Sequence, residues 1–247
     1  MKKVFAMQVF FVIAVFAIVI GATFPSRYQS IEYQKNNRYD DQVKNQLELA
    51  QLRYDKVLGD PDHKMSDVWQ ARDTLVDCLW ESQRFDEAMK LMTQQMAETW
   101  PLKHNEYNHA WAETSRKLGD LHRDAFQIEA AIVVYQSVLD HDKQYLKADD
   151  PIIARDLNNL AMALYMKGSG FEEKDKRYQE FAKAESYLKQ GLDIIKKNNI
   201  EKSTKASSIY WNLYLVVRDQ EKIQEAENYR TIAQAIDKSM NRVCREP

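Results

Sequence analysis

Glycine and proline are scarce in this chain, with six and five among its 247 residues. Sheet-rich folds need many turns that contain Gly or Pro, so this scarcity favours long helices. Only two cysteines are present, Cys78 and Cys244, and they lack the paired spacing of a zinc site. Neither sign of charge dominates, since 35 basic residues face 37 acidic ones. That balance leaves no basic footprint for a nucleic-acid partner.

Catalytic and metal-binding motifs are also missing. The chain has no His-Glu-x-x-His pattern and no Gly-rich phosphate loop. His104 and His109 are five residues apart, which does not place two ligands on one helical face. Met89, Met92 and Met96 share a helical stripe, which is typical of a core. We therefore expect no enzyme activity, no cofactor, no metal site and no small-molecule substrate.

The first 23 residues form an apolar segment. Val4 to Ile20 is apolar apart from Gln8, and two lysines precede it. Twenty helical residues span roughly 30 Å, the thickness of a bilayer's hydrocarbon core. We predict an uncleaved signal-anchor, a single transmembrane helix, with the body outside the cytoplasm, in a periplasmic or extracellular space. The alternative is cleavage after Ala22, which would give a secreted soluble protein.

Four further segments follow the apolar one. Residues 24–40 are polar and are predicted to be a linker, and residues 41–59 show helical periodicity that indicates a capping helix or a degenerate repeat. Residues 60–237 are predicted to form an array of about four helix hairpins. Residues 238–247 are predicted to be a frayed tail.

A repeated small-residue pattern defines the array. Ala88, Ala131, Ala184 and Ala226 are spaced 43, 53 and 42 residues apart, and each begins the second helix of a hairpin. Self-similarity at this period predicts an all-α stack of helix pairs, with a plain amphipathic bundle as the alternative. The longer interval places either an exposed loop or a lengthened helix start in the third unit after residues 168–170, with the second helix starting at about Tyr178.

Small residues have a steric role in such hairpins. Gly119 and Ala161 offer no bulk in first helices, where the axes of paired helices approach. Met92, Tyr135 and Leu188 lie four positions after their alanines and can fill the space opposite. We expect each large side chain to pack at a small residue of its partner helix.

The start of the third unit resembles a signature of tetratricopeptide repeats (TPR) of the 42-residue, kinesin-light-chain kind. The signature is Pro-x-x-Ala-x-x-Leu-Asn-Asn-Leu-Ala, and the matching segment is Pro151-Ile152-Ile153-Ala154-Arg155-Asp156-Leu157-Asn158-Asn159-Leu160-Ala161. The resemblance covers roughly residues 66–236. It implies a short right-handed superhelical solenoid whose first helices line a concave groove for a protein or peptide partner. Tyr214 and Arg230 depart from the pattern, so the fourth unit is expected to be a solvated cap.

The resemblance also implies which residues face the groove. In related repeats, an asparagine at the position of Asn159 and Asn212 binds a peptide's backbone, because an amide offers donors and an acceptor without charge. The alternative is an exposed asparagine or one that bridges neighbouring units. The residues we predict for the peptide-binding groove are Asp73, Asp77, Trp80, Arg116, Lys117, Arg123, Arg155, Asn158, Asn159, Met162, Tyr165, Trp211, Asn212, Leu215 and Arg218.

The charges of this set suggest two possible faces. The acidic residues lie at the start of the groove and the basic ones follow, so a basic stripe for an acidic peptide is one interpretation. A solvated face of mixed charge is the other. The sequence thus predicts a membrane-anchored, non-catalytic scaffold. The alternative is a structural subunit of a membrane complex that uses its outer surface, where Trp100 and Trp111 would matter more.

Overall fold

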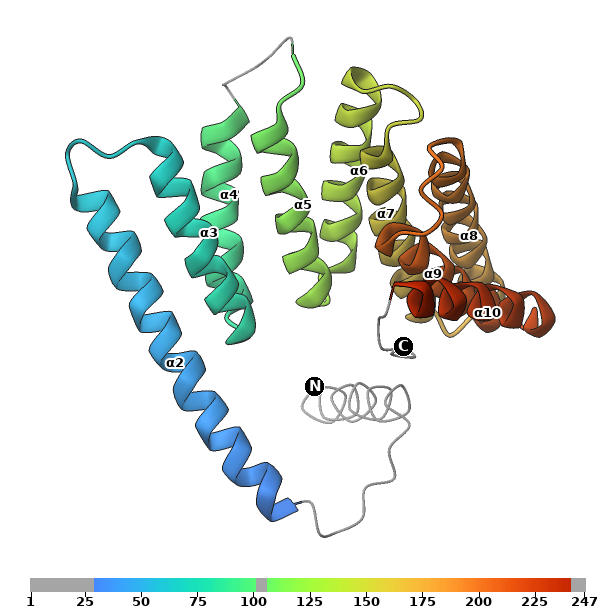
Figure 1. Cartoon of the computed structure of the whole chain (residues 1–247), viewed down its shortest axis with the longest axis horizontal. Coiled ribbons are helices and arrows are strands. Elements are labelled where there is room, and N and C mark those ends of the chain that lie inside the picture. The colour runs from blue at the N-terminus through green and yellow to red at the C-terminus, as the bar shows by residue number, and fades with distance from the viewer. Residues whose placement is uncertain (1–28, 101–105, 241–247) are drawn as a thin grey trace. The chain divides into compact units, whose positions relative to one another are not determined.

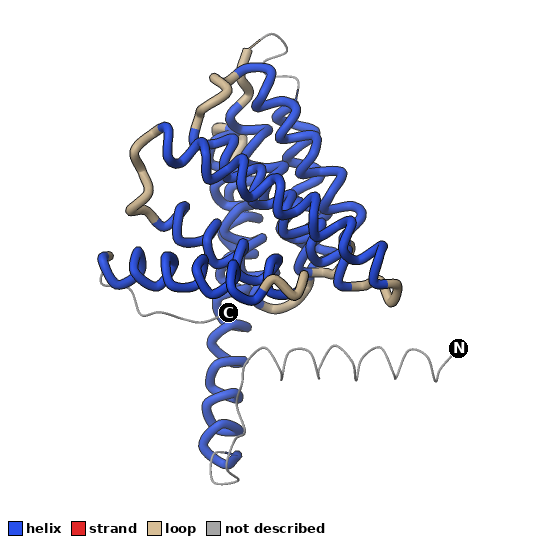
Figure 2. The backbone as a smooth tube through the Cα atoms, turned by 90° about the vertical axis from the view of Figure 1, so that its right-hand side faces the viewer, coloured by secondary structure: helices blue, strands red, loops and turns tan. Residues whose placement is uncertain are grey.

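The computed structural model describes residues 29–100 and 106–240, with side chains from residue 41 onward. The chain divides into two compact units, residues 1–44 with 245–247, and residues 45–244. Within the described ranges there are nine α-helices and no strand (Figures 1 and 2). None of these helices is both long and apolar enough to cross a bilayer. The predicted signal-anchor over residues 1–23 lies outside the described residues.

The helix α2 (Gln29–Gly59) begins inside the segment predicted to be a linker. Residues 29–40 of that segment belong to this helix, so helical structure starts before the predicted start at residue 41. Asn36 and Asn37 suggested a linker, but asparagine is only a weak helix breaker, and neither Gly nor Pro interrupts the chain between Gln29 and Leu58. The helix predicted over residues 41–59 is the continuation of α2, and its Ala50 and Tyr54 are buried in the second unit.

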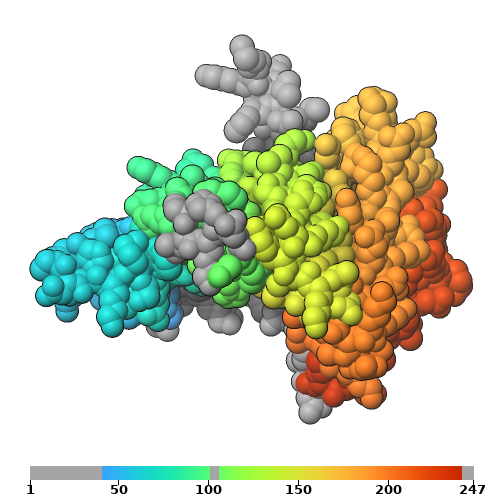
Figure 3. Space-filling model, turned by 90° about the horizontal axis from the view of Figure 1, so that it is seen from above, coloured from blue at the N-terminus to red at the C-terminus, as the bar shows by residue number. Residues whose placement is uncertain are grey.

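Four helix hairpins make up the rest of the second unit, as the small-residue pattern predicts. Neighbouring helices pack against each other in chain order, and the colours of Figures 1 and 3 follow one another along the array. The hairpins are α3 (Met65–Glu81) with α4 (Phe85–Thr99), α5 (His109–Asp124) with α6 (Ile128–Tyr145), α7 (Pro151–Ser169) with α8 (Lys174–Lys197), and α9 (Thr204–Asp219) with α10 (Ile223–Ser239). Of the predicted tail, residues 241–247 lie outside the described residues.

Local signals set the helix boundaries. The Asp150 carboxylate accepts a hydrogen bond from the Ile152 backbone N–H at 2.8 Å, and Pro151 occupies the first position of α7. That is the arrangement the Asp-Pro pair predicts, because proline lacks the N–H that a helix start leaves unbonded. At the turns between first and second helices, Gln83, Phe126 and Glu221 have φ angles of 58°, 59° and 65°. These left-handed residues end α3, α5 and α9.

The repeated alanines lie in the core. Ala88, Ala131, Ala184 and Ala226 are all buried, at 0–1% exposure. The large residues that follow three of them by four positions are buried too, namely Met92, Tyr135 and Leu188. The second helices therefore bury one register of small and large side chains, and the predicted contact with a small residue of the partner helix is observed for Tyr135 at Gly119.

The third hairpin takes the second of its two predicted forms, a lengthened helix start. The helix α8 begins at Lys174, before the predicted start near Tyr178, and Gly168 is buried inside α7 rather than opening the inserted segment. A Cβ at Gly168 would lie 2.8 Å from Cε1 of Phe181, so the missing side chain lets the ring of Phe181 approach the α7 backbone. This glycine acts through close packing, not through a turn.

Candidate functional site

A cavity of about 390 Å³ opens along the first helices of the array. We call it the groove cavity. Residues of α3, α5 and α7 line it, together with two side chains from α4. Five of the groove residues implied by the repeat pattern lie there: Asp73, Arg116, Lys117, Arg155 and Asn159. The structure therefore brings residues from three successive hairpins to one concave site.

A second, smaller cavity of about 150 Å³ lies between α7 and α9. Its lining includes Arg155 and Asn158 from α7, together with Lys205 and Ser208 from α9. Arg155 lines both cavities, so the two hollows meet at this side chain. The predicted groove extends in this way toward the fourth hairpin.

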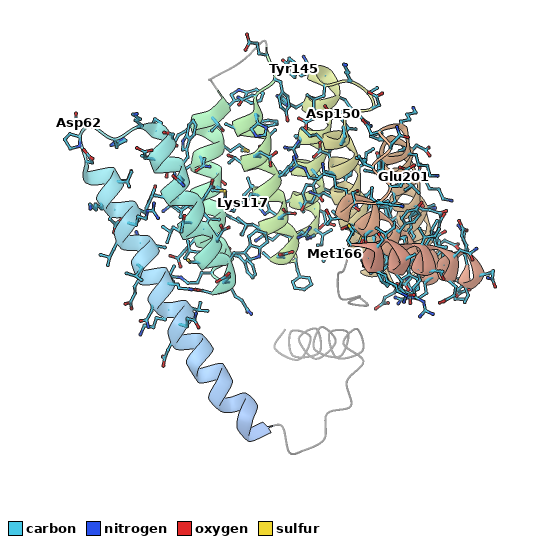
Figure 4. The ribbon with its side chains drawn as sticks, viewed as in Figure 1. Asp62, Lys117, Tyr145, Asp150, Met166 and Glu201 are labelled. Atoms are coloured by element: carbon cyan, nitrogen blue, oxygen red, sulfur yellow. The ribbon has the colours of Figure 1, made fainter. Side chains whose placement is uncertain are left out.

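The groove charges neutralise one another. Lys117, labelled in Figure 4, reaches from α5 to α3, where its Nζ lies 2.7 Å from Oδ1 of Asp77. Arg155 on α7 pairs with Glu113 on α5 at 2.7 Å. Burial alone would raise the pKa of Glu113, but the hydrogen bond and charge of Arg155 lower it. These pairs favour the face of mixed charge over the basic stripe.

Arg116 changes its role from the one predicted. Its side chain is only 4% exposed and binds inward, with Nε donating to Oδ1 of Asp156 at 2.6 Å and Nη2 bonded to Asp142. Burial and the neighbouring Asp142 carboxylate raise the pKa of Asp156 despite its bonds to Arg116. Although Arg116 lines the cavity, its guanidinium joins α5 to α6 and α7. Its role is therefore structural, and we no longer expect it to contact a partner.

The two tryptophans of the set are also engaged. Trp211 is buried at 9% exposure, and its Nε1 donates to Oδ2 of Asp237 at 3.0 Å, so it joins α9 to α10 inside the core. This corrects its predicted place in the groove. Trp80 is half-buried, and its Nε1 donates to Oδ2 of Asp124 at 3.0 Å, which links α3 to the end of α5.

Several predicted contacts instead bridge successive first helices. The Tyr165 hydroxyl donates to Oδ2 of Asp219 at 2.6 Å, and Asn212 Nδ2 donates to Oδ1 of Asn158 at 2.8 Å. Both bonds join α7 to α9. For Asn212 the bridging alternative therefore describes the observed geometry.

The remaining basic residues of the set pair within their own helices. Arg123 binds Asp120 at 3.0 Å, and Arg218 binds Asp219 at 2.8 Å. Arg218 also lies over the ring of Tyr214, 5.3 Å from its centroid. Neither guanidinium is left as an isolated charge for an acidic partner.

Three predicted groove residues remain half-buried with no side-chain hydrogen bond among the described residues: Asn159, Met162 and Leu215. Asn159 also lines the groove cavity. Its amide keeps its donors and acceptor available, which is what peptide-backbone recognition requires.

The repeat pattern missed the groove residues that come from outside the first helices. Gln95 lines the cavity from α4, although second helices are expected to stay behind the groove. It is 4% exposed and follows Ala88 and Met92 at helical spacing, with Thr99 next along the same stripe. Polar residues that continue a buried stripe begun by apolar ones are the signal that could have identified it. Within the described part of the chain, no group of three or more His, Cys, Asp and Glu side chains could hold a metal ion.

Neither protein-family models nor curated protein sequences match this chain. Solved structures do resemble it. A kinesin-light-chain protein of Podosopora anserina with nearly identical TPR-like repeats superposes with a TM-score of 0.60 at 18% identity, covering 90% of this chain and 100% of that one. BtubC of P. vanneervenii gives a TM-score of 0.55 at 16% identity, with 83% and 94% covered.

A third similar structure is PlcR of Bacillus thuringiensis, solved in complex with a peptide and DNA. It has a TM-score of 0.58 at 13% identity, and 92% of this chain and 85% of that one are covered. At these identities the likeness concerns the backbone arrangement alone. The chain therefore has the fold of TPR-like repeat proteins, an all-helical array of stacked hairpins.

Proposed function

We propose that this chain is a non-catalytic scaffold that captures a protein or peptide partner in the groove along α3, α5, α7 and α9. The observation that carries the proposal is the groove cavity, where three hairpins contribute polar side chains to one concave site. Arrays of this architecture offer extended concave surfaces, which suit the binding of a chain segment.

Two groups in this groove fit a peptide backbone. Arg155 Nε is buried and donates to no acceptor among the described residues, and the amide of Asn159 lines the same cavity. A buried donor without an acceptor is costly, and a peptide carbonyl would satisfy it. The guanidinium itself is held by Glu113, so its orientation is fixed before a partner arrives.

The membrane part of the proposal rests on the sequence. The apolar run from Val4 to Ile20 is long enough to span a bilayer, and Lys2 and Lys3 favour an amino terminus inside and a body outside the cytoplasm. The intact mass of the mature protein distinguishes an uncleaved anchor from a secreted form. A mass lacking the first 22 residues would contradict the anchor.

Site-specific photo-crosslinking in the native cell tests the groove. A crosslinking amino acid at position 159 samples the cavity, whereas one at position 133 samples α6, where Val133 is 66% exposed. We expect a discrete crosslinked partner from position 159 and none from position 133. Crosslinks confined to position 133 would instead support the outer-surface subunit and would contradict capture in the groove.

A further inference from the structure

The buried side-chain amide of Gln95 has one atom without a hydrogen bond among the described residues. Its Nε2 donates to Oδ1 of Asp73 and to Oγ1 of Thr114, both at 3.3 Å, which joins α4 to α3 and α5. Rotating the amide by half a turn would set its oxygen against the Asp73 carboxylate, so these bonds fix its orientation. Oε1 is then buried and accepts no hydrogen bond among the described residues, although Gln95 lines the groove cavity.

Trp69 and Asp73 line the same cavity as this amide. They lie four residues apart on α3 and both line the cavity, so they share one face of the helix. Trp69 Nε1 donates to Oε2 of Glu98 at 3.1 Å, which occupies the polar edge of the indole. The indole therefore contributes carbon surface to the cavity. Asp73 contributes a carboxylate that is 46% exposed.

We propose that the corner formed by Trp69, Asp73 and Gln95, which we call the guanidinium corner, receives an arginine side chain of the captured peptide. The three groups that line it are a carboxylate, an amide oxygen without a donor and an aromatic ring, and each attracts a cationic donor. A guanidinium can donate to Asp73 and to Gln95 Oε1 at once while its plane lies on the indole. This inference rests on the proposed function and names what one part of the groove selects.

The protein's own cations leave the Gln95 oxygen without a donor. Lys117 Nζ lies 2.7 Å from Asp77, donates to the Asp73 backbone carbonyl at 3.3 Å and lies 3.8 Å from Oδ1 of Asp73, so its closest ion pair is with Asp77. Arg72, which is 1% exposed, is bonded through both terminal nitrogens to Glu98. Neither of these cations donates to Gln95 Oε1, so this acceptor is left for an incoming side chain.

Binding of short peptides to the full-length chain in a non-ionic detergent tests the inference. The probes are capped Gly-Arg-Gly, the same peptide with neutral citrulline in place of arginine, and capped Gly-Glu-Gly. Binding is read from the NMR signal of the Trp69 indole N–H, which the Trp69→Phe variant identifies. We expect the arginine peptide to bind about tenfold more tightly than the citrulline peptide.

Substitutions locate the effect. Asp73→Asn should weaken the arginine peptide about tenfold, because it removes the charge and keeps the shape, and Gln95→Met should weaken it roughly threefold. Asp67→Asn is the matched control, since it makes the same charge change at an exposed site in the first turn of α3. Circular dichroism and thermal melting establish that each variant is folded.

Two results would overturn the guanidinium corner: equal binding of the arginine and citrulline peptides, or an Asp73→Asn variant that binds arginine as the parent does. If either occurs while position 159 still crosslinks to a partner, the corner is wrong and the groove proposal stands. Loss of crosslinking at position 159 contradicts the groove proposal, whatever the peptides show.

Discussion

Gly119 on α5 and Tyr135 on α6 are in such close contact that a Cβ at Gly119 would lie 2.5 Å from Cε1 of the tyrosine ring. The Tyr135 hydroxyl is held in place as well, since it donates to Oδ1 of Asp120 at 2.5 Å. The ring itself is buried at 1% exposure. The second hairpin therefore depends on the absence of a side chain at one position.

Replacing Gly119 by alanine should destabilise the fold. The added methyl group overlaps a buried ring, and overpacking of this kind costs about 1–3 kcal/mol. Urea denaturation followed by circular dichroism measures the change in the free energy of unfolding. Gly59→Ala is the control, because a Cβ there meets nothing within 4 Å. A Gly119→Ala variant as stable as the Gly59→Ala variant would show that the contact is not tight.

Removing the Arg116 guanidinium should destabilise the array more severely. Arg116→Met leaves the buried carboxylates of Asp142 and Asp156 without their counter-charge, and breaking a buried ion pair from one side costs about 3–5 kcal/mol. Arg84→Met, at an exposed pair with Glu87, should change stability by less than about 1 kcal/mol. Similar unfolding curves for the two variants would contradict the structural role of Arg116.

Glu185 should make the fold sensitive to acid. Burial would raise its pKa, but hydrogen bonds from Lys189, Lys222 and Gln220 lower it to about 2, from an ordinary value of 4.5. A lowered pKa contributes stability that is fully present above pH 4.5 and is lost as the pH falls toward 2. A shift of this size corresponds to about 3 kcal/mol.

Comparison with Glu185→Gln isolates this effect. Other groups also titrate in this range, and Asp156, whose pKa is raised, becomes less destabilising as the pH falls. The difference between the two proteins cancels such contributions. We expect the parent to be more stable above pH 4.5 and the difference to shrink between pH 4.5 and pH 2. A difference that does not vary with pH would contradict the assignment.

Asn159 and Asn212 should respond differently to alanine. Asn159 lines the groove cavity and makes no side-chain hydrogen bond to described residues, so Asn159→Ala should weaken partner capture and leave stability within about 0.5 kcal/mol. Asn212→Ala removes the bond to Asn158 and should lower stability by about 1 kcal/mol. Partner pull-down and thermal melting of both variants measure the two effects. If the parent and the Asn159→Ala variant captured the partner equally, the Asn159 amide would not take part in binding.

The hairpins could be predicted from the sequence because their signals are local. Ala88 and its counterparts recur in one register, and the Asp150–Pro151 pair marks a helix start whatever the rest of the chain does. The roles of Arg116 and Trp211 could not be predicted in this way. The buried partners of Arg116, Asp142 and Asp156, lie 26 and 40 residues away, and Asp237, which accepts from Trp211, lies 26 residues away, all on other helices.

Which residues line the groove could be predicted only in part, because their contacts also depend on residues that are distant in the sequence. The repeat pattern assigns a residue to a face of its helix, which suffices for Asn159 and Lys117. It does not show that a residue of a neighbouring helix binds the side chain and takes it from a partner, as Asp219 does when it accepts the hydrogen bond of Tyr165. It also treats α4 as a supporting helix, so Gln95 was not expected in the cavity.

Hydrogen–deuterium exchange of the full-length chain, with and without its crosslinked and identified partner, tests the central claim most directly. If the groove captures the partner, the added protection should concentrate in α3, α5, α7 and α9, and α6, α8 and α10 should change little. Protection confined to α6, α8 and α10, with α3, α5, α7 and α9 unchanged, would contradict binding in the groove.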